Sequence, residues 1–469
     1  MSMGKLRFLS AHPLWVMFLM ITWGLVFILQ GIAWSEELKK ERIIMTLPEL
    51  IGMAIAKSPE IGEIQSEIGM ARSDLEQVKA AYFPQLESTA LVGPVRDAKE
   101  PEILNGRITD PSPSLSASSI GIFGRLDVTM TQPLYTFGKL SNRKEAADKG
   151  VRAKEFQLEE KNAQIALRVK KLYYALVLAR AGVEAANEAG GFFEEAGRSI
   201  HRLLEISSPN AKEGDIYLID AYQADTIRSK AESEKGAKVA YFTLKSMIGL
   251  PPGVGFDTAD KTLSMKREDL ADVESYIQEA KDKRPEFKQL AEALAAQKSK
   301  VEAAASDRYP SFFVALQASL AGAPGRDSLH NPYIRDDFNH TDAGVVAGLK
   351  WNFDFGIGRA KIDKMMAEYN KLLYTRASAE MNTIIQVSNI YEEQLEWQQA
   401  VNSYQRAANA SRKWVFTAMA DFGMGVGTAE EMLKAIERYG HNQGKYIEAL
   451  FHYNLSLAEL EYAVGMKAW

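Results

Sequence analysis

Residues 125–138 read Arg-Leu-Asp-Val-Thr-Met-Thr-Gln-Pro-Leu-Tyr-Thr-Phe-Gly, and the hydrophobic period changes within this stretch. From Arg125 to Thr131 apolar and polar residues alternate, which predicts a β-strand with two different faces. Beyond Gly138 apolar residues recur every seven positions, the seam spacing of a coiled-coil helix. They are Val151, Leu158, Ile165, Leu172 and Ala179, with Val169, Leu176 and Val183 interleaved. A helix over about 139–205 would be about 100 Å long, too long for a compact globular core.

The same succession of patterns occurs twice in the chain. A helical stretch from Ser58-Pro59-Glu60 to Tyr82-Phe83-Pro84 has a counterpart from Arg284-Pro285-Glu286 to Arg308-Tyr309-Pro310, 226 residues later at both ends. Asn352-Phe353-Asp354-Phe355-Gly356 echoes the end of the quoted stretch, 218 residues on. The repeat predicts a second alternating strand over 349–355 and a second long helix over about 359–420.

Each predicted strand has an upstream partner, at 86–92 in the first unit and 312–320 in the second. The two hairpins have strands of about nine residues, the length of a transmembrane β-strand, and long loops at about 93–120 and 321–343. Four strands are too few to close a membrane barrel, and open edges are not tolerated in lipid. We therefore expect the chain to oligomerise, and three copies would supply twelve strands.

Aromatic residues stand at every predicted junction between helix and strand. Rings gathered at one end of all the strands would form an interfacial girdle at the level of the lipid headgroups. The predicted girdle residues are Tyr82, Phe83, Tyr135, Phe137, Tyr309, Phe312, Trp351, Phe353 and Phe355.

The start of the chain has the pattern of a secretory signal. Lys5 and Arg7 precede an apolar run over 14–29, and Ala33-Trp34-Ser35 provides a small-x-small exit. We expect residues 1–35 to be a signal peptide, with an uncleaved single-span anchor as the alternative. The predicted organisation is then a first repeat at 36–250, a linker at 251–270 rich in Pro and Gly at its start, and a second repeat at 271–469.

The amino-acid composition excludes several classes of function. The 469 residues contain no Cys, so disulfide frameworks, thiol catalysis and Cys-ligated metals are excluded. The net charge of −5, with Lys and Arg scattered, gives no nucleic-acid footprint. No P-loop, metal-spaced histidine pair or catalytic constellation is found. The expectation is a protein that is not an enzyme and has no cofactor and no metal.

The motifs together resemble the TolC-like outer-membrane efflux proteins over about 46–469. The resemblance is carried by Met45-Thr46-Leu47-Pro48-Glu49-Leu50, the helix end at 80–84, Gln132-Pro133-Leu134-Tyr135-Thr136-Phe137-Gly138, Met247-Ile248-Gly249-Leu250-Pro251-Pro252-Gly253 and Tyr453-Asn454-Leu455-Ser456-Leu457-Ala458-Glu459-Leu460. It implies a mostly α fold with a small β portion: long antiparallel helices forming an α-barrel across the periplasm, and a trimeric twelve-stranded β-barrel in the outer membrane.

The resemblance also implies the function and the partners. A homotrimer of this kind is a passive duct that exports small molecules or polypeptides, fed by an inner-membrane pump through a periplasmic adaptor and held in outer-membrane lipid. In such proteins the periplasmic tip is closed at rest, and acidic side chains there can form a cation-attracting ring. Asp421, just before the turn at 422–427, matches such a gate position best, and Asp215, just after the turn at 207–214, matches it less well.

Two other classes remain as alternatives. A periplasmic coiled-coil adaptor or scaffold would also be exported and rich in heptads, but it would not be expected to carry two amphipathic hairpins with aromatic ends. An exported enzyme would need a catalytic constellation that the sequence does not show.

Overall fold

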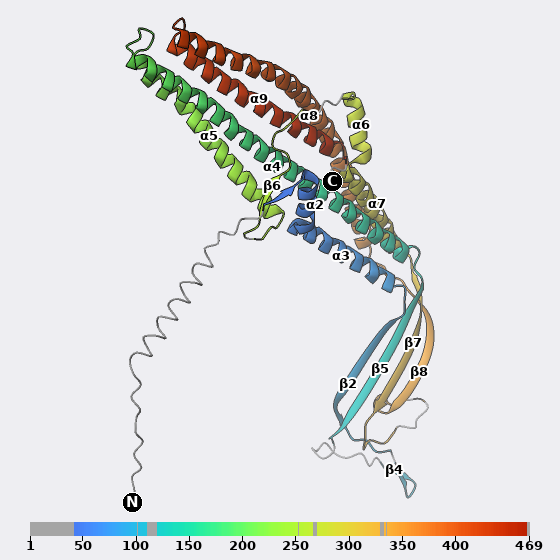
Figure 1. Ribbon diagram of the computed structural model, residues 1–469. Helices are drawn as coiled ribbons and strands as arrows, with labels where there is room; N and C mark the ends of the chain where they lie inside the picture. The colour runs from blue at the N-terminus through green and yellow to red at the C-terminus, as the bar shows by residue number, and fades with distance from the viewer. Residues whose placement is uncertain are drawn as a thin grey trace, which may run out of the picture.

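The computed structural model describes residues 42–100, 102–109, 120–251, 253–265, 270–328, 333 and 335–466. These residues form an elongated molecule with a body of long helices at one end and an extended antiparallel sheet at the other (Figure 1). The predicted signal peptide at 1–35 lies outside the described residues. Within the described part of the chain, no helix is both long and apolar enough to cross a membrane.

The first half of the chain alternates helix, sheet and helix. Its described elements are β1 (Arg42–Met45), α2 (Leu47–Lys57), α3 (Pro59–Ala80), β2 (Gln85–Arg96), β3 (Glu102–Leu104), β4 (Arg107–Thr109), β5 (Ile120–Tyr135), α4 (Lys139–Glu205) and α5 (Gly214–Met247). The long helix α4 has the bounds that the heptad pattern predicts. Its side chains at Val151, Ile165, Val169 and Leu176 are buried, as seam positions should be.

The second half has the same order of main elements. They are β6 (Gly255–Thr258), α6 (Val273–Lys283), α7 (Pro285–Ser306), β7 (Ser311–Gly322), β8 (His340–Lys350), α8 (Ile357–Met424) and α9 (Ala429–Ala463). Both α3 and α7 are 22 residues long and begin at a proline, whose fixed φ suits the first helical turn. Thr428 begins α9 by accepting a hydrogen bond from the backbone N–H of Glu431 (3.2 Å).

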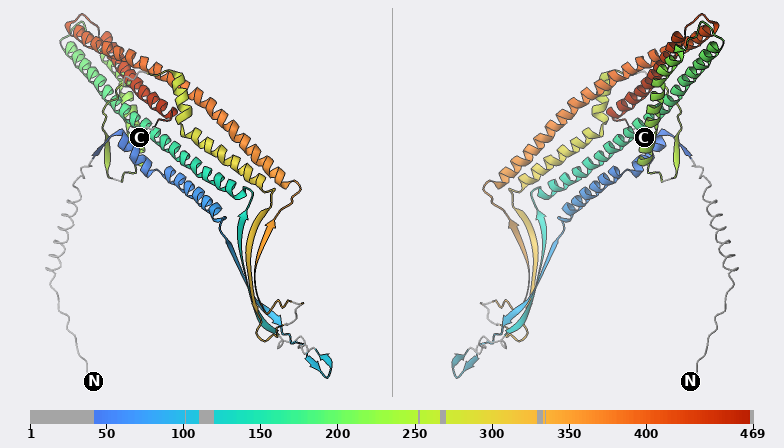
Figure 2. Two further views of the ribbon diagram at one scale, coloured as in Figure 1. Left: turned by 90° about the vertical axis from the view of Figure 1, so that its right-hand side faces the viewer. Right: turned by 90° about the vertical axis from the view of Figure 1, so that its left-hand side faces the viewer.

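The sheet has the strand order β2-β5-β7-β8, and every pair is antiparallel. Two of the pairs are the predicted hairpins, and the third, β5 with β7, joins the two halves of the chain. The strands run from the helical body to the far end and are longer than the nine residues expected, at 11 to 16 residues (Figure 2).

The predicted strand at 349–355 is wrong. The strand β8 occupies His340–Lys350, and residues 351–354 are irregular before α8 begins at Ile357. The pairing explains the end of the strand, because β7 begins at Ser311, which pairs with Lys350. Beyond that residue the alternating side chains have no partner strand.

The short elements β1, β6, α2 and α6 lie beside the middle of the long helices (Figure 1) and were not predicted; we call this group the belt. The strands β1 and β6 pair in parallel, so a segment from the start of the first half lies beside one from the start of the second. The short helices α2 and α6 precede α3 and α7. One hydrophobic core packs here around Tyr173 and Leu244, both fully buried, and includes residues of α2, α4, α5 and β6.

We expect Leu244→Ala to weaken this core. Removing a buried leucine side chain costs about 2–5 kcal/mol of unfolding free energy. Val239→Ala on the same helix is the matched control, because Val239 is 58% exposed and its truncation should change the free energy by less than about 0.5 kcal/mol. Denaturant unfolding followed by circular dichroism at the helical signal measures both. Equal midpoints for the two variants would contradict the assignment of Leu244 to a core.

Candidate functional site

The four-stranded sheet has two chemically different faces. Directly paired residues lie on the same face, so the register assigns every side chain to one face or the other. One face is apolar and has no ionisable residue before Arg96 at its far end. It carries Leu86, Ala90, Val92, Ile122, Leu126, Val128, Met130, Val314, Leu316, Leu320, Val345 and Leu349.

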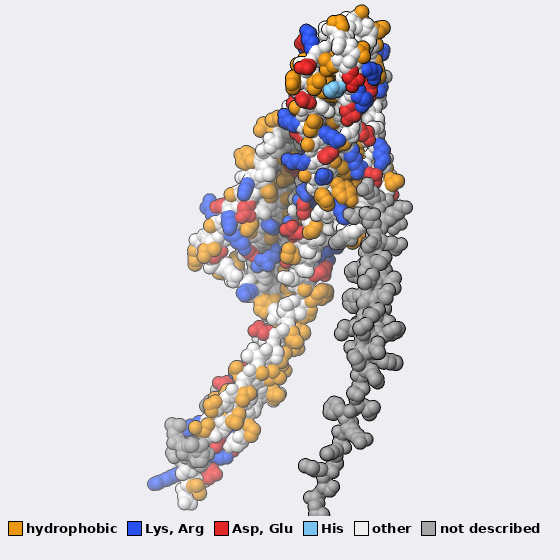
Figure 3. All heavy atoms as spheres, turned by 60° about the vertical axis from the view of Figure 1, so that its left-hand side comes forward, with side chains coloured by type: hydrophobic (Ala, Val, Ile, Leu, Met, Phe, Trp, Pro, Cys, Tyr) orange, Lys and Arg blue, Asp and Glu red, His pale blue; other side chains and the backbone are white. Residues whose placement is uncertain are grey.

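The opposite face holds the charged side chains of the strands. They are Glu87, Arg125, Asp127, His340, Asp342 and Lys350, with Thr129, Gln317 and Ser319 among them. The apolar face is open to its surroundings, as Val92 (80% exposed), Leu86 (69%) and Val345 (68%) show. Figure 3 shows hydrophobic side chains along the sheet, whereas charged ones gather on the helical body and at the far end. An apolar face of this size fits lipid better than water.

Both edges of the sheet are open. Within the described residues β2 pairs only with β5, and β8 pairs only with β7. Each edge strand therefore presents a row of backbone N–H and C=O groups without strand partners, 12 residues long in β2 and 11 in β8. In hydrocarbon such groups must find partners, and further copies of the same sheet would supply them.

The nine predicted girdle residues all lie where the sheet meets the helices. The Phe137 ring is the centre of one group, 4.7 Å from Tyr135, 5.2 Å from Tyr309 and 6.3 Å from Phe312 between ring centroids. Trp351 and Phe353 form a second pair at 4.6 Å. Tyr82, Phe83 and Phe355 stay exposed without joining either group. The structure thus brings rings from both halves of the chain together at one level.

A backbone conformation that occurs in both halves of the chain places these rings at the junction between sheet and helices. Phe137 and Gly138 both have positive φ (49° and 87°), and so do Phe355 and Gly356 (46° and 136°). Left-handed backbone ends the extended strand direction and lets the helix start at the next residue, and glycine adopts it without strain. The Phe-Gly pair is therefore the turn that joins sheet to helix in each half.

At the opposite end of the molecule the two interhelical turns lie against each other (Figure 1). A Cβ placed on Gly425, which has a φ of 79°, would come within 2.4 Å of the Asn210 side chain. Below the turns, α4, α5, α8 and α9 share a core that contains Phe193, Phe422 and Leu433, each fully buried. The helical tip is therefore a packed four-helix end and not two free hairpins.

One carboxylate links three of these helices. Glu188 on α4 accepts a hydrogen bond from the Tyr439 hydroxyl of α9 (2.5 Å) and pairs with the Arg412 guanidinium of α8 (2.9 Å). Burial, followed by the hydrogen bond to Glu188, raises the pKa of Tyr439 above its ordinary value, so the phenol stays protonated and can donate. Sequence reasoning missed this link, because its members are single polar residues 27 to 251 positions apart with no local motif.

The two predicted gate carboxylates have different surroundings. Asp215 accepts a hydrogen bond from the backbone N–H of Lys212 (2.9 Å), so it caps the start of α5. Asp421 lies in the last turn of α8, and its backbone C=O accepts from the N–H groups of Val426 (3.0 Å) and Gly427 (3.1 Å). The Asp421 carboxylate is partly exposed and has no ionic or hydrogen-bond partner among the described residues.

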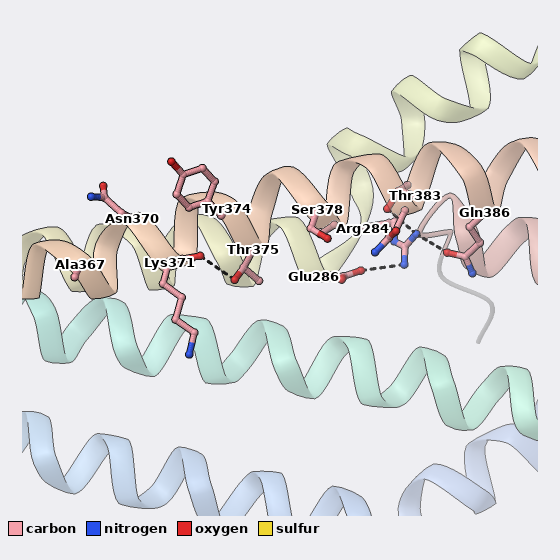
Figure 4. A pocket seen from close by; sticks show the side chains of 12 residues that line it. Arg284, Glu286, Ala367, Asn370, Lys371, Tyr374, Thr375, Ser378, Thr383 and Gln386 are labelled. Atoms are coloured by element: carbon pink, nitrogen blue, oxygen red, sulfur yellow. Dashed lines mark hydrogen bonds and ion pairs between the residues drawn. The ribbon is translucent and has the colours of Figure 1, made fainter.

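An open groove of about 970 Å³ lies beside α8 at the level of the belt. Figure 4 shows one face of α8 from Ala367 to Gln386 along it, with Arg284 and Glu286 from the start of α7. Arg284 donates to Thr383 (3.1 Å) and Gln386 (3.0 Å) and pairs with Glu286. These bonds fasten α7 to α8. Among the described residues no three acidic or histidine side chains group closely enough to hold a metal ion.

Comparison with known proteins finds one matching family model and several solved structures of similar fold. Residues 276–466 match the family model described as outer membrane efflux protein. The outer-membrane channel OprN superposes with a TM-score of 0.74 at 17% identity, over 92% of this chain and 95% of its own. CusC gives 0.73 at 16% identity (90% and 92%), and VceC of Vibrio cholerae gives 0.73 at 15% (90% and 96%). No curated protein matches the sequence. At these identities the structural likeness establishes the fold.

We expect Glu188→Ala to loosen the helical tip. A hydrogen bond to a charged group contributes about 1.5–3 kcal/mol, so amides of α8 and α9 near the link should exchange roughly tenfold faster or more. Hydrogen–deuterium exchange by mass spectrometry measures this. Glu194→Ala on the same helix is the control, because Glu194 is 68% exposed and its ion pair with Arg198 is long, at 4.0 Å. Unchanged protection in Glu188→Ala would show that the Glu188 link does not contribute to the stability of the tip.

Proposed function

We propose that three copies of this chain, a TolC-like outer membrane efflux protein, form a passive duct from the periplasm through the outer membrane to the cell exterior. The observation that carries the proposal is the two-faced sheet with open edges that continues into helices about 100 Å long. Lipid would cover the apolar face, and the charged face would line a water-filled pore.

Closure of the sheet requires further copies, and the resemblance to the TolC-like channels, which are trimers, makes the proposed number three. The free edge of β8 in one copy would pair with the free edge of β2 in the next, and three sheets of four strands would make a twelve-stranded barrel. The helices α3, α4, α7 and α8 leave the sheet side by side (Figure 2), so the same threefold arrangement would close them into an α-barrel. In a water-soluble adaptor or scaffold the apolar face would be exposed to water, which disfavours that alternative.

The proposed topology places the aromatic level and the long helices on the periplasmic side. The predicted signal at 1–35 would bring the chain across the inner membrane. The nine girdle residues would then lie at the inner interface of the outer membrane, where aromatic rings sit at headgroup level. The outer loops and the hairpin of β3 and β4 would project from the cell surface.

The helical tip offers a surface for a periplasmic adaptor. Ile206 (70% exposed), Met424 (70%) and Val426 (78%) project from the two turns without apolar cover. A groove of about 820 Å³ also runs between α5 and α9, over α4, and offers room for a partner helix. Tyr222, Asp225 and His441 are among the residues that line it. An inner-membrane pump would supply the cargo through that adaptor.

We expect single cysteines to report this topology, because the natural chain has no Cys to confuse the labelling. A membrane-impermeant maleimide should label Ile108→Cys and Ser328→Cys on intact cells, since both lie at the far end of the sheet. Val426→Cys at the helical tip should react only after the cells are ruptured. The reverse pattern would invert the topology, and a monomer in detergent with full β content would overturn the barrel.

Asp421 is the proposed gate carboxylate. Three copies converging on a narrow axis would attract cations, whereas scattered carboxylates would be screened over about 8 Å by salt. The capping bond of Asp215 gives that residue a local structural role instead.

Asp421→Asn should therefore lower cation selectivity and weaken the block by multivalent cations in planar-bilayer recordings. Asp215→Asn, the matched acidic control at the neighbouring turn, should leave both properties close to those of the natural protein. Unchanged selectivity and block in a trimeric Asp421→Asn protein would show that this carboxylate is not the cation-attracting group.

A further inference from the structure

The described residues 335–339, which precede β8, lie over the charged face of the sheet. The Phe338 ring makes an edge contact with Phe123, with centroids 5.1 Å apart. Phe123 lies on the charged face, where it covers Gly93: a ring carbon is 3.1 Å from the position that a Cβ on Gly93 would occupy. The guanidinium of Arg326 lies 4.8 Å from the centroid of Phe338. Phe338 is therefore held between a strand and its own loop.

Hydrogen bonds build the turn that carries Phe338. The Asp336 side chain, only 6% exposed as a residue, accepts from the backbone N–H groups of Phe338 (3.0 Å) and Asn339 (3.3 Å). The Asn339 side chain accepts from the N–H of Ala323 (2.7 Å) and donates to the C=O of Arg326 (3.2 Å). These bonds fix the two described ends of the segment to each other, as the side chains of Asx turns do.

The base of the turn is anchored to the charged face. His340 donates through Nδ1 to the C=O of Asp336 (2.8 Å), and its Nε2 lies 2.8 Å from the Ser319 hydroxyl. Ser319 in turn donates to Asp127 (2.6 Å), which pairs with Arg125 (2.8 Å). The residues that carry the turn are thus bonded to three neighbouring strands on one face only.

The first outer loop reinforces this arrangement. Arg326 donates to the C=O of Arg96 (2.7 Å), and the N–H of Asp327 donates to the C=O of Ala98 (3.0 Å). The Asp327 carboxylate accepts from the N–H of Glu100 (3.2 Å) and pairs with Lys99 (3.3 Å). The contacts lie at the end of the sheet farthest from the helices (Figure 2). The two outer loops are therefore fastened together beside the turn.

From these contacts we propose that the described segments 323–328 and 335–339 form a second constriction, at the outer mouth of the pore and separate from the helical tip. The inference rests on the proposed function, because a loop on the charged face narrows a passage only if that face lines a closed barrel. In the trimer three Phe338 turns would then project toward the axis. The outer mouth would limit which solutes pass even when the tip is open.

The test uses the full-length trimer with the tip loosened by Glu188→Ala, so that the tip no longer dominates the resistance. Single-channel conductance is compared for Glu188→Ala with and without Phe338→Ala, and neutral polymers of graded size are added from the outer side. Ile103→Ala is the matched control, because Ile103 lies on the β3–β4 hairpin at the same end of the molecule and is 76% exposed. Arg326→Leu, which removes the guanidinium above the ring, is a second variant should Phe338→Ala fail to form trimers.

The expected result is a gain in conductance and admission of larger polymers with Phe338→Ala or Arg326→Leu, and no change with Ile103→Ala. Conductance and polymer cut-off equal to those of Glu188→Ala alone, in an intact trimer, would overturn the outer constriction while leaving the duct itself in place. Trimers that pass no current in any variant would overturn both the duct and the constriction.

Discussion

The backbone N–H and C=O groups on the free sides of the two edge strands are the constraint on which the rest of the structure depends. Strands β2 and β8 each have one hydrogen-bonded neighbour, and the apolar face between them is suited to hydrocarbon, where no water can satisfy the free edges. Pairing between copies is the arrangement that satisfies both edges at once. That requirement calls for further copies of the chain, and in the proposed trimer the number of copies would set the width of the helical tunnel.

The junction between sheet and helices fixes the position of each helix relative to the strand beside it. A proline at 84 and 310 stands between helix and strand, and a Phe-Gly pair precedes the helix that follows the sheet in each half. At the same level Asp307, at the end of α7, pairs with Lys139 of α4 (2.7 Å) and Lys361 of α8 (2.9 Å). Burial acts to raise the pKa of Asp307, but the two ammonium groups outweigh it and hold the pKa below its ordinary value. The helices therefore keep fixed spacing where they leave the sheet.

The two ends of the molecule are held together by different chemistry. Near the helical tip, Glu188 bonds to the exposed Arg412 of one helix and to Tyr439 of another, which is buried in the core. At the outer end, aromatic stacking and side-chain-capped turns hold a loop against the sheet. A movement at the tip can break two polar contacts while the helices stay paired, whereas the outer turn can move only by separating the two loops.

The sequence by itself determined the elements whose signal is periodic. The long helix α4 and the two faces of the hairpins follow from residues that repeat every seven or every two positions, because each residue's burial is set by the element to which it belongs. The duplication follows from motifs that recur 226 and 218 residues apart. Only the tertiary structure decided where β8 ends, since alternation continues through 351–355 although no strand remains to pair with it. The same holds for the β1–β6 pair, the Glu188 link and the Phe123–Phe338 contact. Each joins residues that are ordinary in their local sequence and meet only because the long helices and strands place them side by side.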